Sequence, residues 1–181
     1  MHLRNPLAGL ALLPCLLAGA PAAVAQSAAS PGVPPTVAVP RPSGVAVRTA
    51  EPPVIDGRLD DAGWRTAEPL TGFVQADPLE GQPASERTEV RVLYDGNAVY
   101  LGVRLHDRNS SEIIITDTRR DSSLSNQDSI KVIFDTFRDR QNGFVFGTNA
   151  AGVQYDAQVR NQGGESSSWD GSWDVQTQQD E

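Results

Sequence analysis

TEVRVLYDGNAVYLGVRLH, residues 88–106, is the stretch that decides the fold of this chain. In its first half, apolar side chains such as Val90 and Val92 recur at every second position, which is the period of a strand with one buried face. Turn-forming residues follow at 95–97, and the alternation resumes over residues 98–106. Two such runs around a turn rich in Asp, Gly and Asn predict an antiparallel β-hairpin.

The same alternation continues to the C-terminal end. Further β-type runs occupy residues 129–135, 143–148, 152–160 and 171–178. No segment keeps the period of an amphipathic helix, so regularly spaced short strands predict an all-β, antiparallel β-sandwich of a jelly-roll-like type. The last run ends in a turn-like stretch at 179–181 with no strand after it. We therefore expect a sandwich truncated before its last strand or strands, and a longer natural chain.

The N-terminal residues have the pattern of a secretory signal peptide. Arg4 precedes an apolar run at 7–17, and small residues then lead to Ala25, which predicts a leader over residues 1–25. The apolar run is too short for a spanning helix, which needs about 20 apolar residues. We expect an exported protein, located in the periplasm, at the outer membrane or at the cell surface.

Composition divides the remaining chain and limits its chemistry. Residues 26–43 are rich in Pro, Ala and Ser and predict an extended linker, and residues 44–181 then form one domain. Loss of the leader removes the only Cys and the only Met, so the domain has no disulfide and depends on a packed core. The formal net charge of −8 argues against nucleic acid as a partner, because phosphate binding needs a basic surface.

Catalytic motifs are missing from the sequence. His106 is the only histidine after the leader, and neither a nucleophile elbow, a P-loop nor a dinucleotide-binding fingerprint accompanies it. Aspartates can hydrolyse glycosides in pairs, but at turns they cap the backbone or bind Ca²⁺. We favour turn caps and assign no metal ligands among Asp56, Asp60, Asp61, Asp107, Asp121, Asp128, Asp135 and Asp139.

A family resemblance begins at PVIDGRLDDAGW, residues 53–64. YLGVRLHD at 100–107, an Asp- and Ile-containing run at 128–135, a Phe-rich run at 144–152 and WDGSW at 169–173 follow in order. This ordered set resembles the family-nine carbohydrate-binding modules over nearly all of the chain after the linker. The resemblance implies a non-catalytic β-sandwich that binds a polysaccharide or oligosaccharide, and such modules can carry structural calcium.

The resemblance also implies a context. Relatives with this style of leader and opening are N-terminal modules of Gram-negative envelope proteins whose remaining chain resembles an outer-membrane β-barrel. The partners implied are therefore carbohydrate and the rest of a longer chain, and the process implied is carbohydrate catabolism.

Sugars are bound by aromatic faces that stack on C–H surfaces and by polar groups that bond hydroxyls. Trp169 follows a Gly- and Ser-rich loop and is the exposed candidate platform, whereas a core position is favoured for Trp64 and Trp173. The candidate carbohydrate-binding residues are Trp169, Trp173, Trp64, Arg104, Asn149, Arg160 and Asn161.

Two other functions fit the same sequence. A structural or interaction sandwich of an outer-membrane protein would have no sugar site, and burial of both Trp169 and Trp173 would favour it. A glycoside hydrolase would use this region as an accessory, with its activity in a part of the chain beyond these residues.

Overall fold

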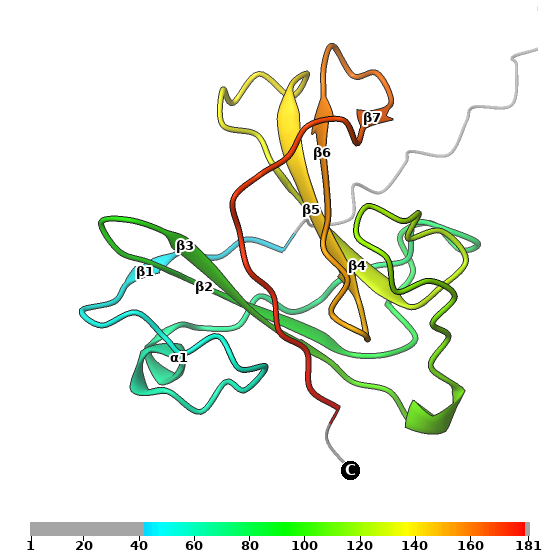
Figure 1. Cartoon of the computed structure of the whole chain (residues 1–181). Helices are drawn as coiled ribbons and strands as arrows, with labels where there is room; N and C mark the ends of the chain where they lie inside the picture. Colours follow the sequence, from blue (N-terminus) through cyan, green and yellow to red (C-terminus); the bar gives the residue numbers. More distant parts are fainter. Residues whose placement is uncertain (1–41, 180–181) are drawn as a thin grey trace, which may run out of the picture. The chain divides into compact units, whose positions relative to one another are not determined.

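The computed structural model describes residues 42–179, which form two β-sheets joined by short helices and loops (Figure 1). The first sheet has the strand order β1-β2-β3 and the second the order β4-β5-β6-β7. In chain order the elements are β1 (Val47–Arg48), α1 (Ala62–Thr66), β2 (Thr88–Tyr94), β3 (Val99–Leu105), the 3-10 helix η1 (Ser110–Glu112), β4 (Ser129–Phe134), β5 (Gly143–Asn149), β6 (Tyr155–Val159) and β7 (Glu165–Ser166). The predicted all-β sandwich is confirmed.

The hairpin predicted from residues 88–106 forms as β2 and β3, which pair antiparallel along their whole length. Asp95 sets the turn, because its Oδ1 accepts hydrogen bonds from the backbone N–H groups of Asn97 (2.6 Å) and Ala98 (2.9 Å). β1 pairs with β2 in parallel on the other side. The three strands thus form a sheet with β3 at its edge.

The second sheet is antiparallel throughout. The tight turn predicted between β5 and β6 is present, with a hydrogen bond from the Gly152 N–H to the Asn149 carbonyl of 3.0 Å. Gly152 has a φ of 74°, a conformation that L side chains rarely adopt. The predicted strand at 152–160 is shorter in the structure, because this turn uses its first residues.

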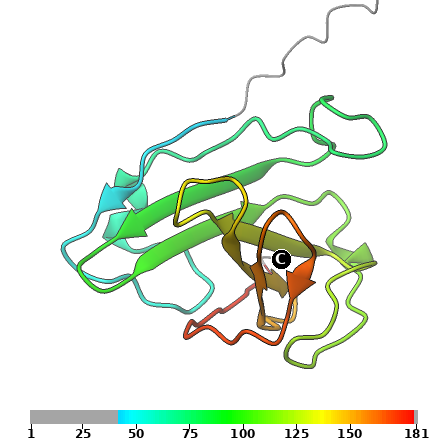
Figure 2. The same ribbon diagram turned by 90° about the horizontal axis from the view of Figure 1, so that it is seen from above.

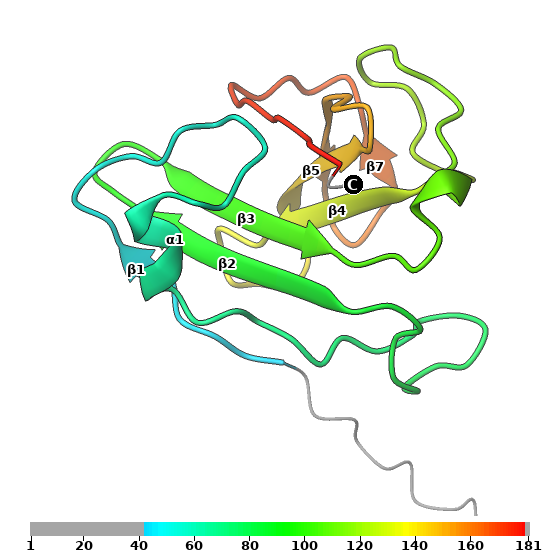
Figure 3. The same ribbon diagram turned by 90° about the horizontal axis from the view of Figure 1, so that it is seen from below.

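The first sheet is covered on the face where α1 lies (Figure 3). There Trp64 of α1 and Leu59 pack against Leu93, whose side chain is fully buried. A Cβ at Gly102 would lie 2.8 Å from both Trp64 and Leu59, so this packing needs glycine. The buried face expected of β2 is wrong: Val90 and Val92 are only half-buried, whereas Glu89 and Leu93 on the other face are buried.

The second sheet has a separate buried cluster. Val145 of β5 and Ala157 of β6 are register partners with no exposed surface, and Leu124 and Tyr155 pack beside them. Because side chains alternate along a strand, the neighbours of Val145 lie on the opposite face. That opposite face carries the aromatic residues of the candidate site.

The prediction of a strand at residues 171–178 is wrong. This segment is extended but belongs to neither sheet. Side chains hold it instead: Gln154 Nε2 donates to the Trp173 carbonyl (2.7 Å), and Thr177 Oγ1 donates to the Ala150 carbonyl (2.9 Å). The fourth strand of the second sheet is the short β7.

Several sequence predictions fall beyond this description. The signal peptide at 1–25 and most of the linker at 26–43 lie outside the described residues, and the truncated C-terminal end remains a prediction. Within residues 42–179, the helices are too short or too polar to cross a membrane.

Candidate functional site

Five aromatic side chains gather on one face of the second sheet. Phe134 of β4 lies beside Phe146, and we call the other four the aromatic cluster: Phe144, Phe146, Trp169 and Trp173. The two phenylalanines belong to β5, and the tryptophans belong to the C-terminal segment, which passes over β5 and β6 (Figure 1). The Trp169 ring centroid lies 4.6 Å from that of Phe144, and the Trp173 centroid lies 5.3 Å from that of Phe146. These are spacings of attractive aromatic pairs, so ring contacts fix the segment.

A buried carboxylate anchors the same segment. Asp156 of β6 has no exposed surface and accepts hydrogen bonds from Trp173 Nε1 (3.2 Å) and from the backbone N–H of Gly171. A Cβ at Gly171 would lie 2.9 Å from the Trp169 ring, so the chain can pass here only as glycine. Asp156 therefore places both tryptophans on the phenylalanines of β5.

Arg120 neutralises the buried carboxylate and extends to the surface. Its guanidinium donates to Asp156 Oδ1 (2.8 Å) and to Gln154 Oε1 (2.6 Å), and it lies 3.5 Å from Asp170 Oδ1. The Arg120 side chain is 42% exposed and that of Asp170 is 77% exposed. A buried charge persists only when paired, and here the pair continues outward as a polar edge beside the aromatic cluster.

Trp169 is the member of the aromatic cluster suited to a ligand. Its ring is half-buried, and its indole N–H makes no hydrogen bond to any other residue in the described range. The indole N–H of Trp173, by contrast, is bound to Asp156. An aromatic face next to a guanidinium and a carboxylate can stack on a sugar ring and bond its hydroxyls.

Two of the other predicted site residues serve the interior. Trp64 is 3% exposed in the core of the first sheet. Asn149 is 2% exposed, and its Nδ2 donates to the Asp117 carbonyl (2.9 Å) and to Gln127 Oε1 (2.9 Å). Their burial leaves almost no surface for a sugar, so we exclude both from the candidate site.

The remaining predicted residues are exposed but lie elsewhere. Arg104 is on β3 of the first sheet, opposite Glu89. Arg160 and Asn161 begin the loop between β6 and β7. The structure therefore brings together only Trp169 and Trp173 of the predicted set.

Sequence reasoning missed Arg120 as part of the site. Its bond to Asp156 spans 36 residues of sequence, and neither residue belongs to a recognisable motif with the other. The one available signal was the need of a buried aspartate for a cationic partner.

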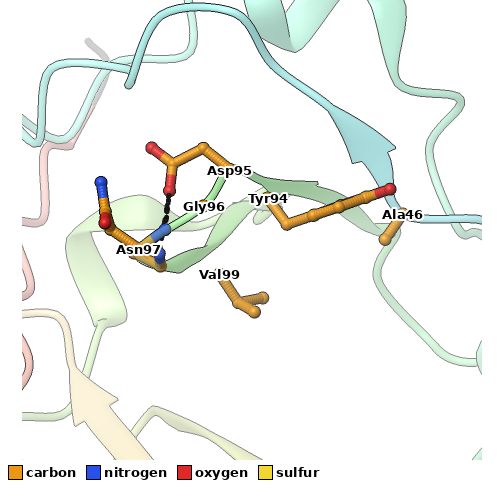
Figure 4. Close-up of a pocket in the computed structure, with 7 residues that line it drawn as sticks. Ala46, Tyr94, Asp95, Gly96, Asn97 and Val99 are labelled. Carbon is orange, nitrogen blue, oxygen red and sulfur yellow. Dashed lines mark hydrogen bonds between the residues drawn. The ribbon is translucent and has the colours of Figure 1, made fainter.

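An open hollow lies at the end of the β2–β3 hairpin, apart from the aromatic cluster (Figure 4). It encloses about 390 Å³ and is lined by Tyr94, which is 39% exposed, together with Ala46, Asn97 and Val99. Asp95 also lines this hollow, and its carboxylate accepts hydrogen bonds from the N–H groups of Asn97 and Ala98 and from the Tyr100 hydroxyl. These bonds also lower the pKa of Asp95.

Several of the acidic side chains accept hydrogen bonds from backbone N–H groups, either within a turn or across the chain. Asp107 accepts a hydrogen bond from the Asn109 N–H (2.7 Å), and Asp128 accepts one from the Ile114 N–H (2.6 Å). Within residues 42–179, no group of three or more His, Cys, Asp or Glu side chains is placed to hold a metal ion. We assign no calcium ligands.

His106 contacts an ion-pair centre on the first sheet rather than a nucleophile. Its Nε2 lies 3.2 Å from Glu89 Oε1, and Arg87 and Arg91 also pair with this carboxylate. Burial alone would raise the pKa of Glu89, but the hydrogen bond with His106 and the two arginine charges outweigh it and lower the pKa.

One of the comparisons with known proteins gives a match. The family model described as carbohydrate family 9 binding domain-like matches residues 55–180, which is more than half of the chain. Neither the curated proteins nor the solved structures give a match. The matched range contains both sheets from α1 onward and the whole aromatic cluster, and the chain therefore belongs to the carbohydrate family 9 binding domain-like family.

Proposed function

We propose that this chain is a non-catalytic carbohydrate-binding module of an exported envelope protein, and that it holds a polysaccharide or oligosaccharide on Trp169. The observation that carries the proposal is the uncommitted indole of Trp169, fixed on Phe144 beside the Arg120–Asp170 edge. A preformed aromatic platform with polar groups at its rim is what sugar stacking requires. Family membership supports the class of ligand.

The biological setting is part of the same proposal. The signal-peptide pattern supports export to the periplasm, outer membrane or cell surface, and a longer chain with an outer-membrane barrel would be the partner. The module would hold a glycan close to enzymes of carbohydrate catabolism. Any glycoside hydrolase activity would belong to a part of that longer chain beyond these residues.

One observation favours the alternative of a structural module without a sugar site. The N–H of Trp173 is bound to the buried Asp156, so this tryptophan fastens the C-terminal segment to the sheet. If the half-buried Trp169 has only the same role, the aromatic cluster is a core contact. The alternative thus differs from the first proposal in the role of Trp169 alone.

Tryptophan fluorescence during titration with neutral oligosaccharides, with and without calcium, separates the two. We expect a saturable shift that disappears in Trp169→Ala. Tyr94→Ala is the matched control, because it removes a partly exposed aromatic side chain on the other sheet and should leave the titration unchanged. A folded protein whose fluorescence shifts with none of the sugars would support the structural module.

A further inference from the structure

Two loops meet at one end of the second sheet, the end at which β5 begins and β6 ends. Residues 135–142 join β4 to β5, residues 160–164 join β6 to β7, and both extend from the same end of the sheet in two views (Figures 1 and 2). The Gln162 N–H donates to the Gln141 carbonyl (2.8 Å), and the Asn161 N–H donates to Asn142 Oδ1 (3.2 Å). The loops therefore form one surface.

Three arginines and a phenylalanine project from this surface, and we call them the arginine tip: Phe137, Arg138, Arg140 and Arg160. Phe137 is 70% exposed, the highest value among the exposed large hydrophobic residues after Val45. All three arginines are exposed. In residues 42–179, the guanidinium groups of Arg138 and Arg140 form no ion pair or hydrogen bond, whereas those of Arg87 and Arg119 pair with carboxylates.

The aspartates of the same loop do not neutralise the arginine tip directly. The two carboxylate oxygens of Asp135 accept hydrogen bonds from the backbone N–H groups of Asp139 (3.1 Å) and Arg140 (2.9 Å). Asp139 accepts hydrogen bonds from the N–H groups of Gln141 (2.8 Å) and Asn142 (2.9 Å). A chain with a net charge of −8 thus presents free guanidinium groups at one place, with its local carboxylates used inside the loop.

The backbone at this surface is unusual. Six non-glycine residues of the described range have positive φ, and four of them lie in these two loops: Arg138 (56°), Arg140 (57°), Asn161 (52°) and Gln162 (55°). Non-glycine residues in this region are strained and persist where surrounding contacts hold them. The capping aspartates and the bonds between loops supply those contacts, so the arginines are presented on a fixed frame.

We propose that the arginine tip binds an acidic polysaccharide through its carboxylate groups, as in a chain of uronic acids. Guanidinium groups bind carboxylates in a two-pronged geometry, and the exposed Phe137 ring can stack on the sugar carrying the acid. The rest of the two loops is polar as well, with exposed amide side chains at Gln141, Asn161 and Gln162. This polar surround fits sugar hydroxyls better than a lipid surface, where several apolar side chains would insert. The inference rests on the proposed carbohydrate-binding function and specifies its ligand class.

Calorimetric titration of the purified chain with oligogalacturonate tests this assignment. The test variant is Arg138→Gln/Arg140→Gln/Arg160→Gln, and the control with the same change of charge is Arg48→Gln/Arg58→Gln/Arg65→Gln, at exposed arginines that form no ion pair in residues 42–179. We expect the tip variant to bind about tenfold more weakly or worse, since charge-assisted bonds are lost, and the control to bind nearly as the parent does. The methyl-esterified oligomer, which has no carboxylates, should bind the tip variant and the parent equally.

Three results would overturn the assignment. They are an absence of oligogalacturonate binding by the folded chain, an equal loss of affinity in both triple variants, and binding to phosphatidylglycerol vesicles instead of the acidic oligomer with loss in the tip variant. The neutral-sugar titration that depends on Trp169 is independent of these outcomes. A shift there without oligogalacturonate binding would contradict only the arginine tip, and the reverse pattern would contradict only the Trp169 platform.

Discussion

Each sheet contains a buried carboxylate surrounded by donors, but the two carboxylates serve different purposes. Glu89 of the first sheet is 8% exposed and contacts side chains of its own hairpin: Arg87, Arg91 and His106. Asp156 of the second sheet has no exposed surface and binds groups from distant parts of the chain: Arg120, Gly171 and Trp173. Glu89 adds side-chain contacts to strands that are already paired through their backbones. Asp156 fastens a segment that has no backbone pairing with either sheet. Only the second arrangement places an available aromatic face at the surface.

Removing the second carboxylate should have the largest effect. Asp156→Ala leaves Arg120, the Gly171 N–H and the Trp173 N–H without their partner, and loss of one member of a buried pair costs about 3–5 kcal/mol. Urea unfolding measures the loss. Asp156→Asn keeps one acceptor and should cost clearly less, and equal losses in the two variants would show that the retained acceptor does not stabilise the fold.

Removing the first carboxylate should cost less, because Arg87 is 63% exposed and regains water. Glu89→Gln should lower the free energy of unfolding by about 1–2 kcal/mol near neutral pH. The folded pKa of Glu89 is below 4.5, so its contribution is present above pH 4.5 and is lost as the pH falls through the folded pKa. Urea unfolding of parent and variant at decreasing pH should show the two stabilities converging below pH 4.5, and a constant difference would contradict the pairing.

The next largest loss of stability is expected where the chain at Gly171 packs against the rings of Trp169 and Phe146. Gly171→Ala would place a methyl group 2.9 Å from the Trp169 ring and 3.0 Å from the Phe146 ring. Such overpacking costs about 1–3 kcal/mol and should move Trp169 from Phe144. Thermal unfolding and near-ultraviolet circular dichroism check both effects. Gly164→Ala, where nothing lies within 4 Å, is the matched control, and equal behaviour of the two variants would contradict the close packing.

The smallest effect is expected in the core of the first sheet. Trp64→Phe removes an indole N–H that is buried and has no hydrogen-bond partner, so only packing is lost. We expect a cost below about 1.5 kcal/mol in thermal unfolding and an unchanged sugar titration. A lost titration would show that the first sheet takes part in binding.

The strands could be predicted from the sequence because their signals are local. The alternation at 88–106 and the turn residues on either side of β5 act within a few positions, and they place β2 to β6 correctly. The segment 171–178 failed because alternation reports an extended chain and not a paired one. Pairing needs a neighbouring strand with free backbone groups. Here the segment is held by Asp156 and by the ring contacts of the aromatic cluster instead.

The candidate site was predictable only in part. Trp169 and Trp173 were predicted from a tryptophan-rich motif, and in the structure both rings pack against phenylalanines of β5. The core position of Trp64 agrees with the role favoured from the sequence, whereas the burial of Asn149 depends on the turn at 149–152, which alternation does not reveal. Arg120 reaches Asp156 across 36 residues, and no sequence pattern marks a contact of that range.

The indole N–H region of a proton–nitrogen NMR spectrum tests the central claim most directly. The chain has three tryptophans, and they differ in environment: Trp64 is buried without a partner, Trp173 is bound to Asp156, and Trp169 is uncommitted. Addition of an oligosaccharide that binds should strongly shift the indole N–H resonance of Trp169 and hardly change that of Trp64. If sugars across a broad panel leave the Trp169 signal unchanged in the folded protein, the platform assigned to Trp169 is wrong.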